Sequence, residues 1–282
     1  MPPAVSLLLR LVLIFLLSCS VNLNALAQDS ATSSPLYSVA LSDLGIAVED
    51  GLSFWSAPAR FSGRDWIIAG GTVAGTIGVI AIDGKLRSSF MRGTEDDIPH
   101  SFWEIPTYYG DWRYAGLFSA GLYSVGLFSG EKDIRVTGRL VLESLVLSGS
   151  VLLALRYMTG RSSPGPNADP WDFRGFQWDA GRQSFPSGHA TVAFALSTVL
   201  AEQIDNTVAR IGLYGMASLT AYARVRFDQH WTSDVLVGAA LGIAAGLHVV
   251  SRERERELQK GRGEGLSITP TLDGFCVQYT FR

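Results

Sequence analysis

The sequence contains very little cysteine. Its 282 residues include only Cys19 and Cys276, and Cys19 lies in a segment with the features of an export signal. If that segment is removed after Ala27, one cysteine remains, which excludes an internal disulfide. The chain also lacks an excess of positive charge, because its formal net charge is −3. This charge argues against a nucleic acid as a partner.

Long apolar runs are also missing. The apolar stretches are only 12 to 18 residues long, and Arg139, Glu143 and Arg210 interrupt them, whereas a bilayer span needs about 20 mostly apolar residues. Six spans after a cleaved signal would also place in the cytoplasm the loops after the third and fifth apolar runs, where the candidate site residues given below lie. The sequence therefore favours an exported domain that is soluble or associated with a membrane. An integral membrane protein stays the alternative, and the Arg-rich stretch after Val250 supports it.

Residues 1–27 resemble a secretory signal. Arg10 forms a short basic region, an apolar segment follows from Leu11 to Leu17, and Ala25-Leu26-Ala27 matches an A-x-A cleavage site. Cys19, which follows Leu-Leu-Ser, leaves a lipoprotein signal open as an alternative. We expect the protein in the periplasm or the cell envelope.

The remaining pattern predicts an all-α fold with a bundle of about six core helices. The expected helices are 67–82, 114–130, 138–155, 190–203, 207–222 and 234–250. Near the C-terminus, Pro270 and Asp273-Gly274 interrupt an alternating pattern, which predicts a short β-hairpin. The expected organisation is a signal (1–27), an N-terminal extension (28–65), a helical domain (66–258) and a C-terminal tail with the hairpin (259–282).

A candidate anion site lies at the start of the fourth predicted helix. Pro186 ends the preceding segment, Ser187 is a suitable N-cap residue, and Gly188 and His189 open the helix. Free backbone N–H groups and the helix dipole attract anions there, and we expect phosphate. A capped helix whose histidine faces water is the alternative.

A second candidate cluster precedes the last predicted helix. Asp234 follows His230 by four residues, so one helical turn can bring its carboxylate to the imidazole. Arg224, six residues before His230, offers a planar fork for phosphate oxygens. An aspartate that merely caps the helix is the alternative. A third cluster, with Arg156 and Arg161, lies at the end of another apolar run.

Together, in order and spacing, these segments resemble the type 2 phosphatidic acid phosphatase (PAP2) and vanadium haloperoxidase superfamily over roughly residues 140–250. That family has the signature K-x6-R-P, then P-S-G-H, then S-R-x5-H-x3-D. The resemblance implies that His230 attacks phosphorus and forms a phosphohistidine, and that Asp234 orients it. It further implies that His189 protonates the leaving oxygen and later activates water, without a metal or another cofactor.

The resemblance also implies the phosphate ligands. These are Arg224 and the backbone amides of Ser187 and Gly188, with Arg156 in the place of the family's lysine. Ser163 occupies the place of the arginine before proline, and Ala223 that of a serine. We expect Arg161, two residues before Ser163, to supply the missing phosphate ligand.

The expected function is that of an exported phosphatase acting on a phosphorylated lipid or a small phosphoester, either a phosphomonoester or a pyrophosphate. A vanadate-dependent haloperoxidase and a non-enzymatic envelope protein with a degenerate site are alternatives. A metal hydrolase that uses His189, Asp228, His230 and Asp234 is a further alternative. The sequence leaves the substrate and the oligomeric state open.

Overall fold

The computed structural model describes residues 35–92, 100–262, 265–271 and 274–280. Within them the chain is mostly helical. The α-helices are α2 (Pro35–Ser56), α3 (Gly63–Arg92), α4 (Glu104–Tyr109), α5 (Trp112–Ser129), α6 (Lys132–Thr159), α7 (Gly188–Ile204), α8 (Thr207–Arg226) and α9 (Thr232–Arg262). Short 3-10 helices are η2 (Ala57–Arg60), η3 (His100–Trp103) and η4 (Ala180–Arg182). The predicted signal, with Cys19, lies outside the described residues.

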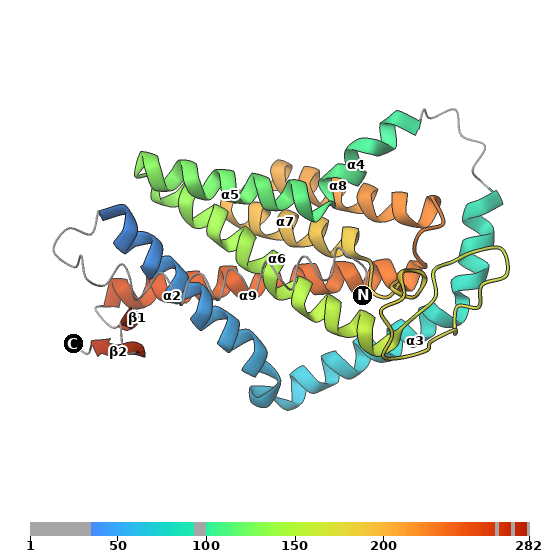
Figure 1. The fold of residues 1–282 in the computed structure, drawn as a ribbon, viewed down its shortest axis with the longest axis horizontal. Helices are drawn as coiled ribbons and strands as arrows, with labels where there is room; N and C mark the ends of the chain where they lie inside the picture. Colours follow the sequence, from blue (N-terminus) through green and yellow to red (C-terminus); the bar gives the residue numbers. More distant parts are fainter. Residues whose placement is uncertain (1–34, 93–99, 263–264, 272–273, 281–282) are drawn as a thin grey trace. The chain divides into compact units, whose positions relative to one another are not determined.

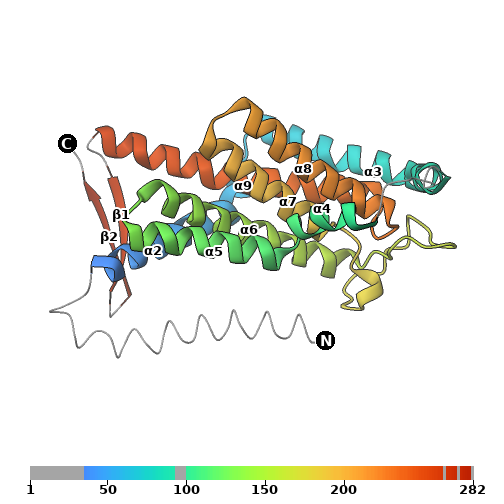
Figure 2. The ribbon, with the colours of Figure 1, turned by 90° about the horizontal axis from the view of Figure 1, so that it is seen from above.

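The chain divides into two compact units, of which residues 54–251 contain every candidate site residue. Within this unit, α5 packs on α6, α6 on α7 and α7 on α8, while the short α4 packs on α8 (Figures 1 and 2). The side chains of its main buried core are Ala115, Val136, Leu140, Val141, Leu147, Leu196, Val199, Ala245, Val249 and Val250. The core therefore joins α5, α6, α7 and α9.

Among the described residues, the other unit combines 35–53 with 252–262, 265–271 and 274–280. It includes two strands, β1 (Gly265–Thr271) and β2 (Gly274–Thr280), which pair antiparallel from Gly265–Thr280 to Thr271–Gly274. These strands lie where the sequence predicts a hairpin. Most of α2, at Pro35–Ser56, also belongs to this unit, although the sequence pattern gave no helix in this region.

The predicted helices are confirmed, but α3, α6 and α9 are longer than the apolar runs in them. In α6 the charged residues do not interrupt the helix, because buried Arg139 and Glu143 pair with each other at 2.9 Å, one turn apart. Three helices are consequently long and apolar enough to cross a membrane, over residues 63–90, 132–159 and 232–260. The expectation that the runs are too short for spans is therefore wrong for these three helices.

Glycines on α9 let it approach α7 closely. A Cβ on Gly238 would lie 2.5 Å from the carbonyl oxygen of Ser187, and a Cβ on Gly242 would overlap the Thr191 carbonyl and lie 2.7 Å from the Ala195 nitrogen. The backbones of the two helices are thus in contact near their N-terminal ends. This contact brings the segment before α7 beside the segment before α9, where His189 and His230 lie.

Replacing Gly242 with alanine is expected to lower the free energy of unfolding by about 1–3 kcal/mol, because the new methyl group overlaps backbone atoms of α7. Thermal unfolding measures the change. Gly215 on α8 is the matched control, because a Cβ there meets nothing within 4 Å. Its alanine variant should gain up to about 1 kcal/mol from the lower helix cost of alanine. Equal effects of both substitutions would contradict this role of Gly242.

Candidate active site

The N-terminus of α7 presents unpaired hydrogen-bond donors. Ser187 is the N-cap residue, but its hydroxyl does not cap the helix and has no hydrogen-bond partner among the described residues, although it is buried. The amides of the first helical turn, from Gly188 to Ala190, have no intrahelical acceptor. The Ser187 amide is different, because it donates to the backbone carbonyl of Asp234 at 3.0 Å. The expectation that this amide binds phosphate is therefore wrong, while the hydroxyl is available.

Arg156 lies directly against this helix end. Its Nε donates to the carbonyl of Pro186 at 3.2 Å, and a Cβ on Gly188 would lie only 3.1 Å from its Nη2. No protein acceptor in the described part of the chain bonds its Nη1 or Nη2. A guanidinium tip with free donors thus adjoins the free amides of α7, where the sequence predicted a phosphate ligand.

Arg224 is a buried second cation, 4% exposed. Its Nη1 donates to the Gln229 side chain at 2.6 Å and its Nη2 donates to the hydroxyl of Thr107 on α4. Its Nε has no hydrogen-bond partner in the residues that the structure covers. Sequence reasoning missed Thr107 and Gln229, the two residues that fix the direction of this side chain.

His230 is held by a backbone carbonyl. Its Nδ1 lies 2.8 Å from the carbonyl oxygen of Ser184 and 3.6 Å from Oδ2 of Asp234. A carbonyl can only accept, so Nδ1 carries the proton and Nε2 has the free lone pair of a nucleophile. The sequence predicted that Asp234 would set this tautomer. The carbonyl of Ser184 is the closer partner, and Asp234 contributes mainly its negative charge.

Asp234 is fully buried, and both of its carboxylate oxygens accept hydrogen bonds. Its Oδ2 accepts the Ser184 hydroxyl at 2.5 Å and the Trp231 amide at 2.9 Å, and its Oδ1 accepts Nη1 of Arg161 at 2.5 Å. Its position is therefore fixed from three sides.

Arg161 does not bind phosphate in this arrangement. Its guanidinium is 0% exposed and bonds Asp234, the Ser233 hydroxyl, Asp83 and, twice, the carbonyl of Pro170. These contacts use all five N–H donors of an arginine. The expectation that Arg161 replaces the arginine missing at Ser163 is therefore wrong: it is the countercharge of two buried carboxylates. Asp83 was missed because it appeared only as the residue that ended an apolar run.

His189 lies among these cations. Burial, the largest cause, and the positive charges of Arg224, His230 and Arg156 together lower the pKa of His189 from 6.5 to about 4, while Asp111 opposes them. Gly110 packs on it so closely that a Cβ there would lie 2.7 Å from the His189 carbonyl. The three predicted segments therefore meet around the start of α7.

The low pKa of His189 predicts a pH dependence of stability. Because the unfolded chain takes up this proton near pH 6.5 and the folded protein only near pH 4, the free energy of unfolding should fall as the pH falls between these values. The contribution of His189 is at most about 1.4 kcal/mol per pH unit. Unfolding temperatures of the wild type and of His189→Asn, measured in buffers without phosphate, should converge as the pH falls. Parallel curves would contradict the lowered pKa.

The carboxylates near the site have cationic partners. Asp228 forms a two-pronged ion pair with Arg87 at 2.5 and 2.6 Å, and Asp234 pairs with Arg161. Among the described residues, no group of three or more His, Cys, Asp or Glu side chains could hold a metal ion. The carboxylates of the metal-hydrolase alternative are thus already engaged.

Comparison with known proteins identifies this region. The family model of the PAP2 superfamily matches residues 138–257, which contain both histidines and all three arginines of the site. The Lipid A 1-phosphatase of Porphyromonas gingivalis is 33% identical over 104 residues, which are 36% of this chain and 20% of that protein. The chain thus matches about a fifth of the length of this relative.

Two crystal structures are also similar. Aquifex aeolicus LpxE is 21% identical, with a TM-score of 0.48, covering 59% of this chain and 93% of that one. The transmembrane PAP2-type phosphatidylglycerolphosphate phosphatase from Bacillus subtilis is 18% identical, with a TM-score of 0.47, covering 74% and 96%. On the family match and the local identity to the curated relative, residues 138–257 of this chain belong to the PAP2 superfamily.

Proposed function

We propose that the protein is a metal-independent phosphatase that removes phosphate from a lipid-linked substrate through a phosphohistidine. The observation that carries the proposal is the meeting of two imidazoles and two guanidinium groups around the free amides of α7. His230 has its Nε2 free, and Arg156 and Arg224 each retain unpaired N–H donors. Such a site stabilises the negative charge of a phosphoryl group in transfer.

In the first step, Nε2 of His230 attacks phosphorus, so that an N–P bond forms while the bond to the leaving oxygen breaks. The leaving oxygen takes a proton from His189. The low pKa of His189 without an anion does not prevent this, because bound phosphate oxygens offset the charges of Arg224 and Arg156 that disfavour protonation. The positive charge that develops on His230 faces Asp234.

In the second step, water attacks phosphorus, the N–P bond breaks and inorganic phosphate leaves. His189, now neutral, takes the proton of the attacking water and returns to its starting state. The Ser187 hydroxyl and the amides of Gly188 and His189 hold the phosphoryl oxygens in both steps.

Two observations support a lipid-linked substrate and a membrane location. The curated relative is named for a phosphatase of lipid A. In addition, only 11% of the most apolar window of α3 is buried, and Ile67 and Val73 on it are 75% and 60% exposed. A surface of this kind is stable in contact with lipid.

The test is phosphate release from phosphatidate, phosphatidylglycerophosphate, undecaprenyl pyrophosphate, lipid A and an aryl phosphate, each with and without detergent and with chelator present. We expect hydrolysis of a lipid phosphate at a higher kcat/KM than the aryl phosphate. Absence of phosphate release from every substrate, together with no vanadate binding, would overturn the proposal. Halide oxidation on adding vanadate and peroxide would instead assign the site to haloperoxidase chemistry.

A further inference from the structure

Asp83 on α3 is a buried carboxylate to which the steps above assign no role. It is 1% exposed, and its Oδ1 accepts the amide of Ser233 at 3.1 Å. Its Oδ2 accepts the Ser233 hydroxyl and Nη2 of Arg161 at 2.9 Å. Asp83 thus bonds both the first turn of α9 and the arginine that holds Asp234.

The charges of this cluster do not cancel. One guanidinium, that of Arg161, lies between two carboxylates, those of Asp83 and Asp234, and all three side chains are 0% exposed. The cluster therefore carries a net charge of −1. Because solvent does not screen these groups, an arginine shared with Asp83 neutralises Asp234 less than an arginine bound to Asp234 alone. Asp234 retains negative charge toward His230, 3.6 Å away.

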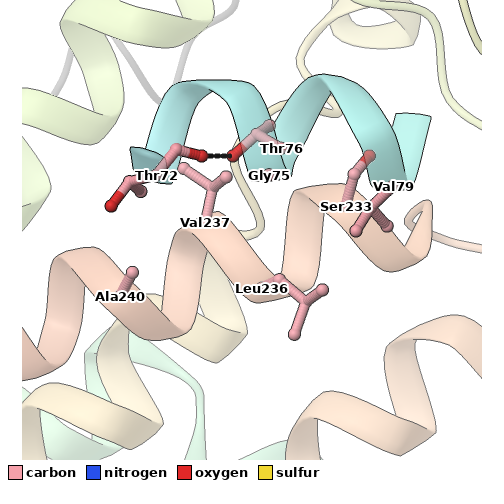
Figure 3. A pocket seen from close by; sticks show the side chains of 8 residues that line it. All are labelled: Thr72, Gly75, Thr76, Val79, Ser233, Leu236, Val237 and Ala240. Atoms are coloured by element: carbon pink, nitrogen blue, oxygen red, sulfur yellow. Dashed lines mark hydrogen bonds between the residues drawn. The ribbon is translucent and has the colours of Figure 1, made fainter. Parts of the chain in front are cut away.

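Packing between α3 and this part of α9 leaves a gap. A cavity of about 180 Å³ lies between the two helices, and Val79, Ser233 and Leu236 are among its lining residues (Figure 3). Val79 is one turn before Asp83, so close packing is incomplete immediately beside the cluster. The hydrogen bonds of Asp83 to Ser233 connect the two helices at this level.

We infer that Asp83 is a positioning residue for the proposed reaction. It fixes Arg161 and the start of α9, and through them it holds Asp234 in place with negative charge toward His230. This inference rests on the proposed function, and it adds α3, outside the matched family region, to the elements that the reaction needs.

The test is Asp83→Asn, which keeps the shape of the side chain and removes its charge. The matched control is Asp65→Asn on the same helix, because the Asp65 carboxylate is exposed and its hydrogen bonds go only to Ser62. We expect kcat per vanadate-binding site to fall by about 10- to 100-fold in Asp83→Asn, with KM and vanadate affinity changed less than about threefold. Asp65→Asn should match the wild type.

A milder variant covers the case in which Asp83→Asn does not fold. Ser233→Ala removes the hydroxyl that donates to Asp83 and accepts from Arg161, and its kcat should fall by about tenfold. Normal kcat per binding site in whichever of these variants folds overturns the inference and leaves the proposed function intact. Absence of phosphate release in both the wild type and Asp65→Asn overturns the two together.

Discussion

Replacing His230 with alanine is expected to lower kcat for phosphate release by about 10⁴-fold or more. The loss follows from the geometry, because Nε2 of His230 is the free imidazole nitrogen whose partner nitrogen is fixed by the Ser184 carbonyl at 2.8 Å. Without it the proposed covalent intermediate cannot form. Phosphate release from the best lipid substrate measures the effect, and acid quench of the wild type should trap a phosphoenzyme that the variant lacks.

His248 provides the control for this experiment. It lies on α9, the helix that begins just after His230, and its ring packs edge-on against Phe54, with centroids 5.3 Å apart. His248→Ala should keep wild-type kcat. Vanadate should still bind to His230→Ala, more weakly, because the arginines and the amides of α7 are unchanged. Turnover by His230→Ala at the wild-type rate would exclude the phosphohistidine route.

Replacing Arg161 with methionine is expected to lower the free energy of unfolding by about 3–5 kcal/mol. The variant leaves Asp83 and Asp234 buried without the cation that both contact, at 2.9 and 2.5 Å. Removing one member of a buried ion cluster lowers stability far more than removing a surface ion pair, because water cannot solvate the buried charges that remain. Chemical or thermal unfolding in detergent measures the loss.

Arg174→Met is the matched control, because the side chain of Arg174 is 64% exposed and its pair with Asp172 is on the surface. We expect a change within about 0.5 kcal/mol for this variant. If Arg161 were instead a phosphate ligand, its removal would raise KM and weaken vanadate binding while leaving stability unchanged. That result would contradict the countercharge role.

The sequence predicted the helices and the meeting of the three segments, but not the contacts inside the site. Helices are encoded locally, by the spacing of apolar residues and by capping residues. The spacing of the family signature predicts that His189, Arg224 and His230 belong to one site. The role of Arg161 depends on Asp83, 78 residues earlier in the chain, and the direction of Arg224 depends on Thr107, 117 residues earlier. Side chains that meet through tertiary packing leave no local pattern.

Some helices were missed or shortened for a related reason. The sequence pattern ended the first core helix at Ile82, because Asp83, Lys85 and Arg87 follow. In the structure, Asp83 bonds Arg161 and Arg87 bonds Asp228, so these charges are compensated and α3 continues to Arg92. A charged residue ends an apolar run in the sequence, but it does not end a helix when another segment supplies its partner.

The glycines of α9 also set the spacing between the two imidazoles. Gly238 and Gly242 fit against backbone atoms of α7 at a four-residue interval, so the two helices can interlock only in steps of about one turn. A slip by one step would displace His230 by about 5.4 Å along α7, more than a reacting distance. The alignment of the two imidazoles is therefore a property of the whole contact between the two helices. A bulky substitution as distant as Gly246, whose Cβ would lie 2.8 Å from Thr198, should misalign the reacting groups without touching either of them.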